Sequence, residues 1–470
     1  MAIAKDIYVQ HQPEVKRYYY NPAVECISRE ELLALQWLKL KKLVEHVYHT
    51  NKFYRNLFTK NKITPEDIQS LEDYRHKVPI ITKQDLLNDQ NEYPPYGLRL
   101  GIPETKVVHT HMTSGTSGIG QEVYGLTRPD VEYLATWPRA WYAAGIRRGD
   151  VVVNPFPMNP VLAAPDSLIS GFAKMGVNGF HLGMYPTHQK LDIMRRFKPH
   201  FMDISPVYLT RMTVICQEMG IDPKKDYCFK AILTMVGSFE VDWALEMQEF
   251  WGCKLHEGYG STQAGSLMGY TCENGSVPNG QRGRIHLMED IILFEVLDRE
   301  TREPVKSGEE GEVVLTTLSR SGSPLLRFAM DDKVRYFSYK ECDCGRPFDT
   351  IECGTIARYD DMIKIRGMNV WPQAVDSVIF GHKETSEYQG RVYVTEDGRE
   401  EVLVQVEFKQ GIGDQVKGDL INRMAVELKE KVGVSMTLEE AKEELPKFEF
   451  KAVRWTDERL KGRQKIAWRL

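Results

Sequence analysis

A run of glycine and small hydroxyl residues, TSGTSG, is the first feature of the sequence that could do chemistry. It has no helical or strand periodicity and cannot fill a core, so it predicts a loop. Backbone amides and hydroxyls in such a loop can hold phosphate oxygens. A P-loop of the G-x-x-x-x-G-K-[ST] type is excluded, because Ile119 and Gly120 follow the last glycine. Taken alone, the run fits a surface linker or an anion-binding loop equally well; its residues are Thr113, Ser114, Gly115, Thr116, Ser117 and Gly118.

Four further polar motifs follow the loop along the chain. On its own, each has a simple structural explanation: a strand end, a surface acidic pair, a β-turn and a charged last strand. The four together, in this order, are harder to explain as coincidence. They are GYGSTQ at 258–263, LLRFAMDD at 325–332, RYDDMIKIRG at 358–367 and LPKFEFKAVR at 445–454.

Cysteine and histidine residues form a second chemically active group. A C-x-C-G turn lies at 342–345, Cys353 follows it, and Cys272 and His286 lie upstream. Thiolate and imidazole ligands at such spacing suit tetrahedral Zn²⁺, and a closed site with four ligands would be structural. Unligated thiols in a reducing compartment are the alternative explanation.

Strand and helix patterns alternate through the middle of the chain, before and between these motifs. This alternation predicts a largely parallel sheet in an α/β domain. Upstream, residues 30–62 carry apolar positions at helical spacing and predict one long amphipathic helix. The alternating segments are the strands DVVVNPF, NGFHLG, KAILTMVGS and KLHEGYG and the helices near 161–175, 187–197 and 241–251.

The pattern changes twice in the second half of the chain. Short β segments with turn signals predict a small β subdomain at about 280–357. From 361 to 470, helices near 372–380 and 416–432 mix with strands RVYVTE, EVLVQVEF and one near 448–456. We therefore expect an α/β protein with a large N-terminal domain (1–360) of α/β subdomains plus the β subdomain. A small α+β C-terminal domain (361–470) follows it.

Composition excludes several classes of function. The 470 residues carry a formal net charge of −5, which gives no basic footprint for nucleic acid. The N-terminus lacks the apolar core of a signal peptide, and no apolar run is long enough to span a bilayer. We expect a cytoplasmic protein with no membrane or nucleic-acid partner. The sequence leaves the oligomeric state open, with a homodimer among the options.

The loop and the four motifs, in this order, resemble the adenylate-forming superfamily and, within it, the phenylacetate–coenzyme A ligase family. The resemblance covers about residues 30–459. It implies a two-step reaction with small-molecule substrates. A carboxylate attacks the α-phosphate of ATP, giving an acyl-adenylate and pyrophosphate. Coenzyme A thiolate then displaces AMP to form the thioester.

Within this resemblance, most nucleotide contacts come from the loop and the first three motifs. The loop at 113–118 would wrap the β- and γ-phosphates. Thr262 would hydrogen-bond the α-phosphate, and Asp332 would bind the ribose hydroxyls, for which a carboxylate is a good double acceptor. The other residues assigned to the nucleotide are Gly237 and Ser238 at the adenine, Tyr259, Gly260 and Ser261 beside the adenine and acyl pocket, and Arg358 at the ribose and phosphates.

Two residues of the last motifs carry the implied movement and catalysis. Asp360 resembles the hinge about which a mobile C-terminal domain turns between the two half-reactions. Lys451 resembles the lysine that bridges the carboxylate substrate and the α-phosphate. A fixed cation stabilises the charge that develops there, typically by about 10²–10³ in rate. A lysine on a mobile domain can also be withdrawn before thioester formation.

The chain departs from the family pattern at two positions. Gln263 stands where relatives usually carry a glutamate that helps to hold Mg²⁺, so the ion would depend more on phosphates and water. Ile119 stands where a lysine often follows the loop. A non-catalytic nucleotide binder is therefore an alternative to the ligase, as is an enzyme that loads a carrier-protein thiol.

The resemblance also places the acyl pocket and the zinc ligands. Pocket walls at Phe156, Phe180, Met235 and Gly258 would suit an aromatic acid such as phenylacetate or benzoate. A small branched or hydroxylated aliphatic acid is the alternative substrate. Some relatives carry a similar cysteine–histidine set, with Cys353 in reserve here; the assigned ligands are Cys272, His286, Cys342 and Cys344.

Overall fold

The structure is a computed structural model of the 470-residue chain. It describes residues 18–113, 121–155, 161–235, 237–366, 368–395, 399–448 and 452–459, with only the backbone of Asp360 and Asn369. Its helices are α1 (Pro22–Glu25), α2 (Arg29–Thr50), α3 (Lys52–Lys60), α4 (Leu71–Lys77), α5 (Lys83–Glu92), α6 (Arg128–Tyr133), α7 (Trp137–Ala143), α8 (Ala163–Met175), α9 (Thr187–Phe197), α10 (Pro206–Glu218), α11 (Pro223–Asp226), α12 (Val241–Trp251), α13 (Pro372–Ile379) and α14 (Asp414–Val432).

The strands fall into one large sheet and three small ones. Those of the first 300 residues are β1 (His109–Met112), β2 (Val123–Leu126), β3 (Val151–Asn154), β4 (Asn178–His181), β5 (Phe201–Ile204), β6 (Ala231–Thr234), β7 (Lys254–Ser261), β8 (Ser266–Thr271), β9 (Arg284–Leu287) and β10 (Ile292–Leu297). The others are β11 (Glu310–Thr317), β12 (Phe328–Phe337), β13 (Thr350–Glu352), β14 (Ala357–Arg358), β15 (Ile363–Ile365), β16 (Met368–Val370), β17 (Thr385–Val394), β18 (Glu400–Phe408), β19 (Thr437–Glu440) and β20 (Trp455–Asp457).

A 12-stranded sheet forms the framework of the N-terminal part. Strands β4, β3, β5, β6 and β7 pair in parallel, which confirms the predicted α/β alternation. From β7 onward the neighbours β8, β9, β13, β12, β11 and β10 pair antiparallel. The β segments expected at about 280–357 thus continue the same sheet and contribute to the same hydrophobic core.

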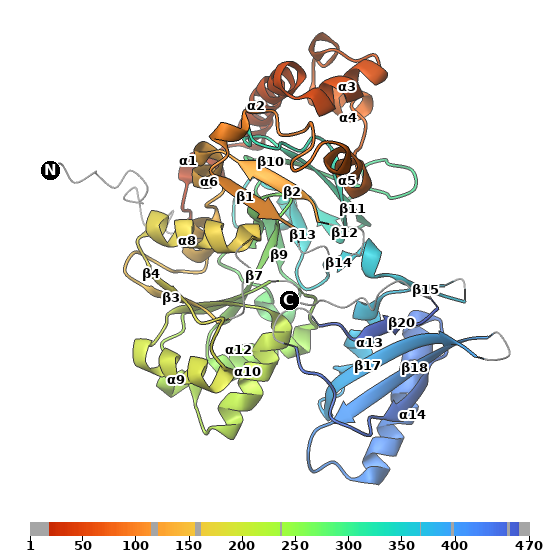
Figure 1. The fold of residues 1–470 in the computed structure, drawn as a ribbon. Coiled ribbons are helices and arrows are strands. Elements are labelled where there is room, and N and C mark those ends of the chain that lie inside the picture. Colours follow the sequence, from red (N-terminus) through yellow and green to blue (C-terminus); the bar gives the residue numbers. More distant parts are fainter. Residues whose placement is uncertain are drawn as a thin grey trace.

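Helices cover both faces of the parallel strands. Figure 1 shows α8 on one side of β3 and β4, and α9, α10 and α12 together on the other. Parallel strands covered in this way are buried on both faces. The fully buried pattern of β5 and β6 agrees with that rule.

The C-terminal part has a hydrophobic core of its own, built from residues between Ile363 and Trp455. Its four-stranded sheet has the order β19-β18-β17-β20, and α13 and α14 pack against it. Figure 1 shows this unit, in blue, beside the large sheet. The two cores support the predicted division of the fold, while the boundary at 360/361 stays a prediction.

The single helix expected over 30–62 is wrong: the segment forms α2 and α3, separated at Asn51. Asn51 leaves the helical conformation (φ −111°, ψ 106°) and its side chain accepts a hydrogen bond from the Tyr54 amide, capping α3. The side-chain nitrogen of Asn51 also donates a hydrogen bond to the backbone carbonyl of Arg99, at 2.6 Å. An asparagine that competes with the helix for backbone partners ends one helix and starts the next.

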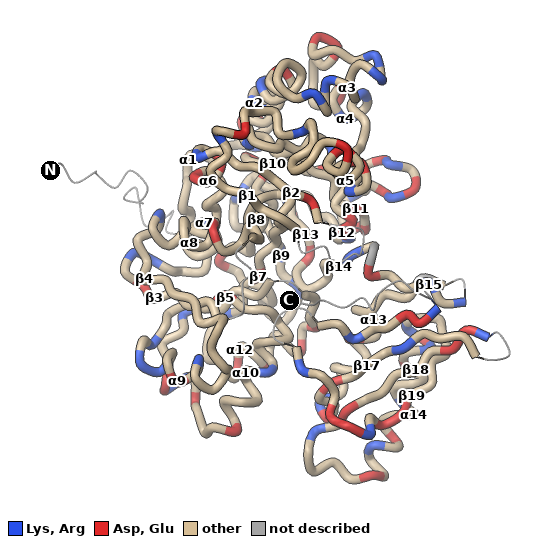
Figure 2. The backbone as a smooth tube through the Cα atoms, in the orientation of Figure 1, with Lys and Arg blue, Asp and Glu red and all other residues tan. Residues whose placement is uncertain are grey.

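Charged residues of both signs are interspersed along the chain, as Figure 2 shows for this view. Among the described residues, no helix is long and apolar enough to cross a membrane.

Candidate active site

A cavity of about 1540 Å³ lies between the two cores. It is the point where the predicted nucleotide motifs and the end of the C-terminal part meet. The predicted residues that line it are Thr113, Met235, Gly237, Ser238, Gly258, Tyr259, Gly260, Ser261, Thr262, Gln263, Asp332 and Arg358.

Three of these residues, from three strands, form a bonded group. The Tyr259 hydroxyl donates to one oxygen of Asp332 at 2.6 Å, and the Arg358 guanidinium donates to the other at 3.1 Å. Strand pairing sets the second contact, because Asp332 on β12 lies opposite Arg358 on β14. Burial and the nearby Asp332 carboxylate raise the pKa of Tyr259, so its hydroxyl stays a donor. The group therefore fixes a carboxylate at the cavity wall.

Gly260 shapes the strand that carries Tyr259. The pairing of β7 with β8 shifts register between Tyr259 and Gly260. A Cβ added at Gly260 would lie 2.9 Å from the Ser266 carbonyl oxygen, closer than side chains approach backbone. A glycine is required there, and the bulge turns the following GSTQ residues toward the cavity.

Sequence reasoning missed two charged residues beside Gln263. The Gln263 amide nitrogen donates to the buried Glu122 carboxylate at 3.1 Å, and Thr113 donates to the same carboxylate. Lys83 of α5 lies 3.5 Å from Glu122 and lines the cavity. Glu122 left a weak signal, as a lone acid at the start of an apolar strand. Lys83 left none, because only the tertiary fold brings it here.

A second buried carboxyl lies on β7, two residues before Tyr259. Glu257 is 2% exposed and accepts a hydrogen bond from the Gly354 amide at 2.7 Å. Burial raises its pKa to about 8, against the opposing effects of the Gly354 amide, Cys353 and Arg282. Near neutral pH this carboxyl is therefore mostly protonated. Cys353, the reserve zinc ligand, lies beside Glu257 and outside the cysteine–histidine cluster.

The wall from the C-terminal part is built around Arg454. Its guanidinium donates to both oxygens of Glu387, at 2.6 and 3.2 Å, and approaches Asp376 at 3.4 Å. The Tyr388 hydroxyl also donates to Asp376, at 2.8 Å. These bonds hold the segment before β20, which follows Lys451 in the chain.

Several predicted residues lie elsewhere or outside the described part. Phe180 is not among the described residues that line the cavity; its ring packs against Phe197 of α9, with centroids 4.9 Å apart. Asp360 lies in the 3₁₀ turn Tyr359–Asp361, between the two cores. The predicted residues outside the described ranges are Ser114, Gly115, Thr116, Ser117, Gly118, Phe156 and Lys451.

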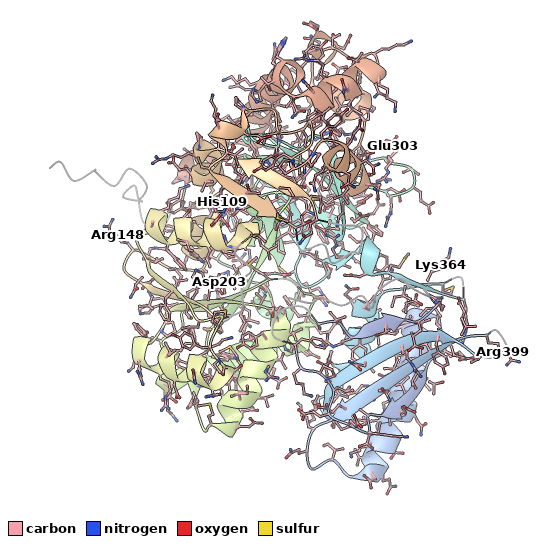
Figure 3. All side chains as sticks on the ribbon, viewed as in Figure 1. His109, Arg148, Asp203, Glu303, Lys364 and Arg399 are labelled. Atoms are coloured by element: carbon pink, nitrogen blue, oxygen red, sulfur yellow. The ribbon has the colours of Figure 1, made fainter. Side chains whose placement is uncertain are left out.

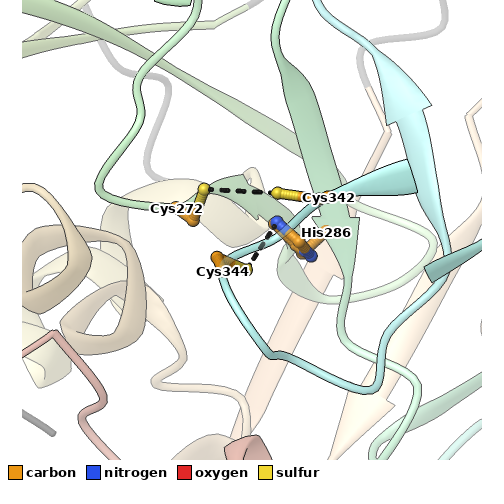
Figure 4. Close-up of side chains that lie close together, drawn as sticks. All are labelled: Cys272, His286, Cys342 and Cys344. Carbon is orange, nitrogen blue, oxygen red and sulfur yellow. Dashed lines mark hydrogen bonds between the residues drawn. The ribbon is translucent and has the colours of Figure 1, made fainter. Parts of the chain in front are cut away.

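The four predicted zinc ligands come together from three segments (Figure 4). Their candidate ligand atoms lie within 4.8 Å of one another. The Cys272 and Cys342 sulfurs are 3.8 Å apart, and Cys344 Sγ lies 3.4 Å from His286 Nε2. Hydrogen bonds from Cys272 and Cys342 hold the pKa of the Cys344 thiol below its usual range, and the thiolate is the form that binds metal.

Known proteins resemble this chain over nearly its whole length. Residues 367–459 match the family described as AMP-binding enzyme C-terminal domain. Phenylacetate-coenzyme A ligase of Thermus thermophilus is 30% identical over 436 residues, covering 89% of this chain and 94% of the relative. The chain belongs to the phenylacetate–coenzyme A ligase family. This ligase therefore uses ATP and coenzyme A and forms an acyl-coenzyme A through an acyl-adenylate.

Solved structures also match the ligase in fold. A 2-hydroxyisobutyryl-CoA ligase in the postadenylation state, bound to an acyl-AMP, superposes with a TM-score of 0.85 at 22% identity, over 96% of this chain and 94% of that chain. An open conformation of the same protein gives 0.69 over 96% of each chain. Both matches show that this chain shares the fold of that ligase.

Proposed function

We propose that the ligase activates an aromatic carboxylic acid such as phenylacetate or benzoate. The observation that carries this proposal is the set of apolar residues in the N-terminal wall of the cavity, which includes Trp137, Leu162, Ala164, Met235 and Gly258. Apolar and aromatic side chains in the wall favour an apolar acyl group. The related ligases named for phenylacetate agree with this choice.

The nucleotide would lie along the bonded wall of the same cavity. Asp332, held by Tyr259 and Arg358, has the acceptor oxygens that ribose hydroxyls need. Thr262 faces the cavity where the α-phosphate is expected, and Lys451 would approach from the C-terminal part. Asp360 would act as the hinge between the parts.

The residues beside the loop fit the Mg²⁺ that accompanies ATP. The Glu122 carboxylate accepts a hydrogen bond from the side-chain nitrogen of Gln263, so this nitrogen faces Glu122. The side-chain oxygen of Gln263, a hard ligand suited to Mg²⁺, then points away from Glu122. Lys83 supplies a cation beside Glu122, whereas the loop has Ile119 at the sequence position where relatives often carry a lysine. We assign Glu122 and Lys83 to the support of the metal–phosphate site.

The cysteine–histidine cluster would hold a structural Zn²⁺. Three sulfurs and one imidazole nitrogen satisfy the usual tetrahedral ligand set. The ion would join the end of β8, strand β9 and the turn at 342–345, beside two neighbouring strands in the middle of the large sheet.

A panel of acids tests the substrate assignment. The ligase is mixed with ATP, Mg²⁺, coenzyme A and phenylacetate, benzoate, isobutyrate or 2-hydroxyisobutyrate, and pyrophosphate and thioester are measured. We expect the highest kcat/KM with an aromatic acid. A preference for either aliphatic acid would overturn the assignment. Pyrophosphate without thioester would indicate a carrier-protein acceptor.

A further inference from the structure

Two histidines and an aspartate converge at a point that the ligase reaction does not use. His109 and His111 are two residues apart on β1, so their side chains leave the same face of the strand. Asp166 lies in the first turn of α8. His111 Nε2 is 2.9 Å from one oxygen of Asp166, and His109 Nε2 contacts the same oxygen. Figure 3 labels His109 in this region, near α8.

The geometry already brings three ligand atoms to one place. The two imidazole nitrogens and the carboxylate oxygen lie within 4.8 Å of one another. Ligand atoms around one ion with bonds of about 2.0–2.2 Å lie about 3 Å apart, so only small rotations are needed. The Met112 amide donates to the Val161 carbonyl at 2.7 Å, which holds the chain before α8 against β1.

Burial is graded across the cluster. The His111 side chain is 3% exposed, and its Nδ1 has no hydrogen-bond partner among the described residues. The side chains of His109 and Asp166 are 33% and 24% exposed. The cluster is therefore closed on the protein side and reachable from solvent on the other. Three ligands on one side leave further coordination positions to water.

We propose that His109, His111 and Asp166 bind a divalent first-row transition-metal ion such as Zn²⁺, Co²⁺ or Fe²⁺. Two imidazoles with one carboxylate select such ions over Mg²⁺ and Ca²⁺, which prefer oxygen ligands. The site therefore differs in chemistry from the magnesium–nucleotide site and from the thiolate cluster. The ion joins β1 to α8 immediately before the phosphate loop, and this proposal does not depend on the identity of the acid.

A cobalt titration tests the site by a readout other than activity. Full-length ligase is loaded with one equivalent of Zn²⁺ for the thiolate cluster, freed of unbound metal, checked for a zinc content of about one per chain and titrated with Co²⁺ in the absence of nucleotide. We expect one further Co²⁺ per chain by elemental analysis after gel filtration. Its visible absorption should be weak and lack a thiolate charge-transfer band. Because the ion binds only the folded chain, Co²⁺ should also raise the Tm.

Substitutions at the two exposed ligands keep the test independent of folding. Asp166→Asn and His109→Gln should each weaken Co²⁺ binding at least about tenfold and remove the rise in Tm. Asp242→Asn, at an exposed aspartate in the first turn of α12, is the matched control and should bind like the unmodified chain. The Tm without Co²⁺ verifies that each variant is folded.

Three results would overturn the proposal. The first is that the unmodified ligase takes up no further Co²⁺ at millimolar concentration. The second is that Asp166→Asn binds Co²⁺ as tightly as the unmodified chain. The third is that a thiolate charge-transfer band accompanies the added ion. Any of them would leave Asp166 as a group that only orients the two imidazoles.

Discussion

On the N-terminal wall of the cavity, the carboxylate of Asp332 is bonded to Tyr259 and Arg358, and both partners lie on strands of the large sheet. On the C-terminal wall, Glu387 and Asp376 bond instead to Arg454, within the smaller core. The first wall presents a fixed acceptor to the cavity. In the second wall, the acidic residues bond to Arg454 and stabilise the smaller core.

This difference suits the two steps of the reaction. Nucleotide recognition benefits from a rigid surface, because positions fixed before binding cost little entropy afterwards. Under the proposed function, Lys451 would act in adenylation and then withdraw, so it would belong on a part that can turn as a unit. The C-terminal core is built from its own residues, and Arg454, which bonds to Glu387 within it, follows Lys451 by three positions in the sequence.

Removal of the Lys451 ammonium should give the largest effect and test the C-terminal wall. Lys451→Ala should slow adenylation by about 10²–10³, because a fixed cation is lost where charge develops. Thioester formation from supplied acyl-adenylate should change little. The control Lys447→Ala removes a nearby lysine that is paired with Glu407. Equal loss of both half-reactions in Lys451→Ala would contradict its role.

Substitution of the proposed zinc ligands should destabilise the N-terminal part alone. If the cluster holds zinc as proposed, Cys342→Ser/Cys344→Ser should lose it together with about 3 kcal/mol of unfolding free energy, in the range expected for a lost structural site. Elemental analysis and denaturant unfolding measure the two effects. Cys228→Ser, at an exposed cysteine, is the control. Unfolding at an unchanged denaturant midpoint, with no metal in the unmodified chain, would refute the zinc site.

Removal of the charge on Asp332 tests whether the fixed wall binds the nucleotide. Asp332→Asn should raise the KM for ATP by about 10- to 100-fold, because hydrogen bonds to a charged group contribute about 1.5–3 kcal/mol. Its neighbour Asp331 pairs with Arg299, and its φ of +58° is one that asparagine adopts readily. Asp331→Asn is therefore a matched control and should change the KM less than about twofold. Comparable KM values in the two variants would exclude Asp332 as a nucleotide ligand.

Local sequence patterns predicted the helices and strands more accurately than they predicted the side-chain contacts between them. The strands and helices from 151 to 261 follow alternation and periodicity within each segment, and most were predicted within a few residues. The segments β5 and α10, between 201 and 218, were not identified. The break at Asn51 was missed because one capping side chain outweighs a continuous apolar stripe.

The site was predictable only where the residues lie in recognisable motifs. Asp332, Arg358 and Tyr259 lie in such motifs, and the strand register brings them together. Lys83 and Glu122 are 39 positions apart, and nothing local indicates their convergence on Gln263. The direction of a side chain on an edge strand, as at Phe180, is also set by tertiary packing.

The smallest effect is expected at Glu257, which tests whether water is excluded from the N-terminal wall of the cavity. Its folded pKa of about 8 exceeds the ordinary value of 4.5, so between these values the folded ligase holds a proton that the unfolded chain has lost. The free energy of unfolding should therefore fall as the pH rises from 4.5 to 8 and level off above 8. Glu257→Gln should remove this contribution, so the stability of the variant relative to the unmodified ligase should be higher at pH 8 than at pH 5.

Urea unfolding at pH 5, 6.5 and 8 measures this difference. Glu246→Gln, at an exposed glutamate of α12, is the control for a simple change of net charge. A gain at Glu257 that does not depend on pH would mean that the carboxyl is already ionised and solvated when folded. Water would then reach the N-terminal wall, and its rigidity would depend on the Tyr259–Asp332–Arg358 hydrogen bonds alone.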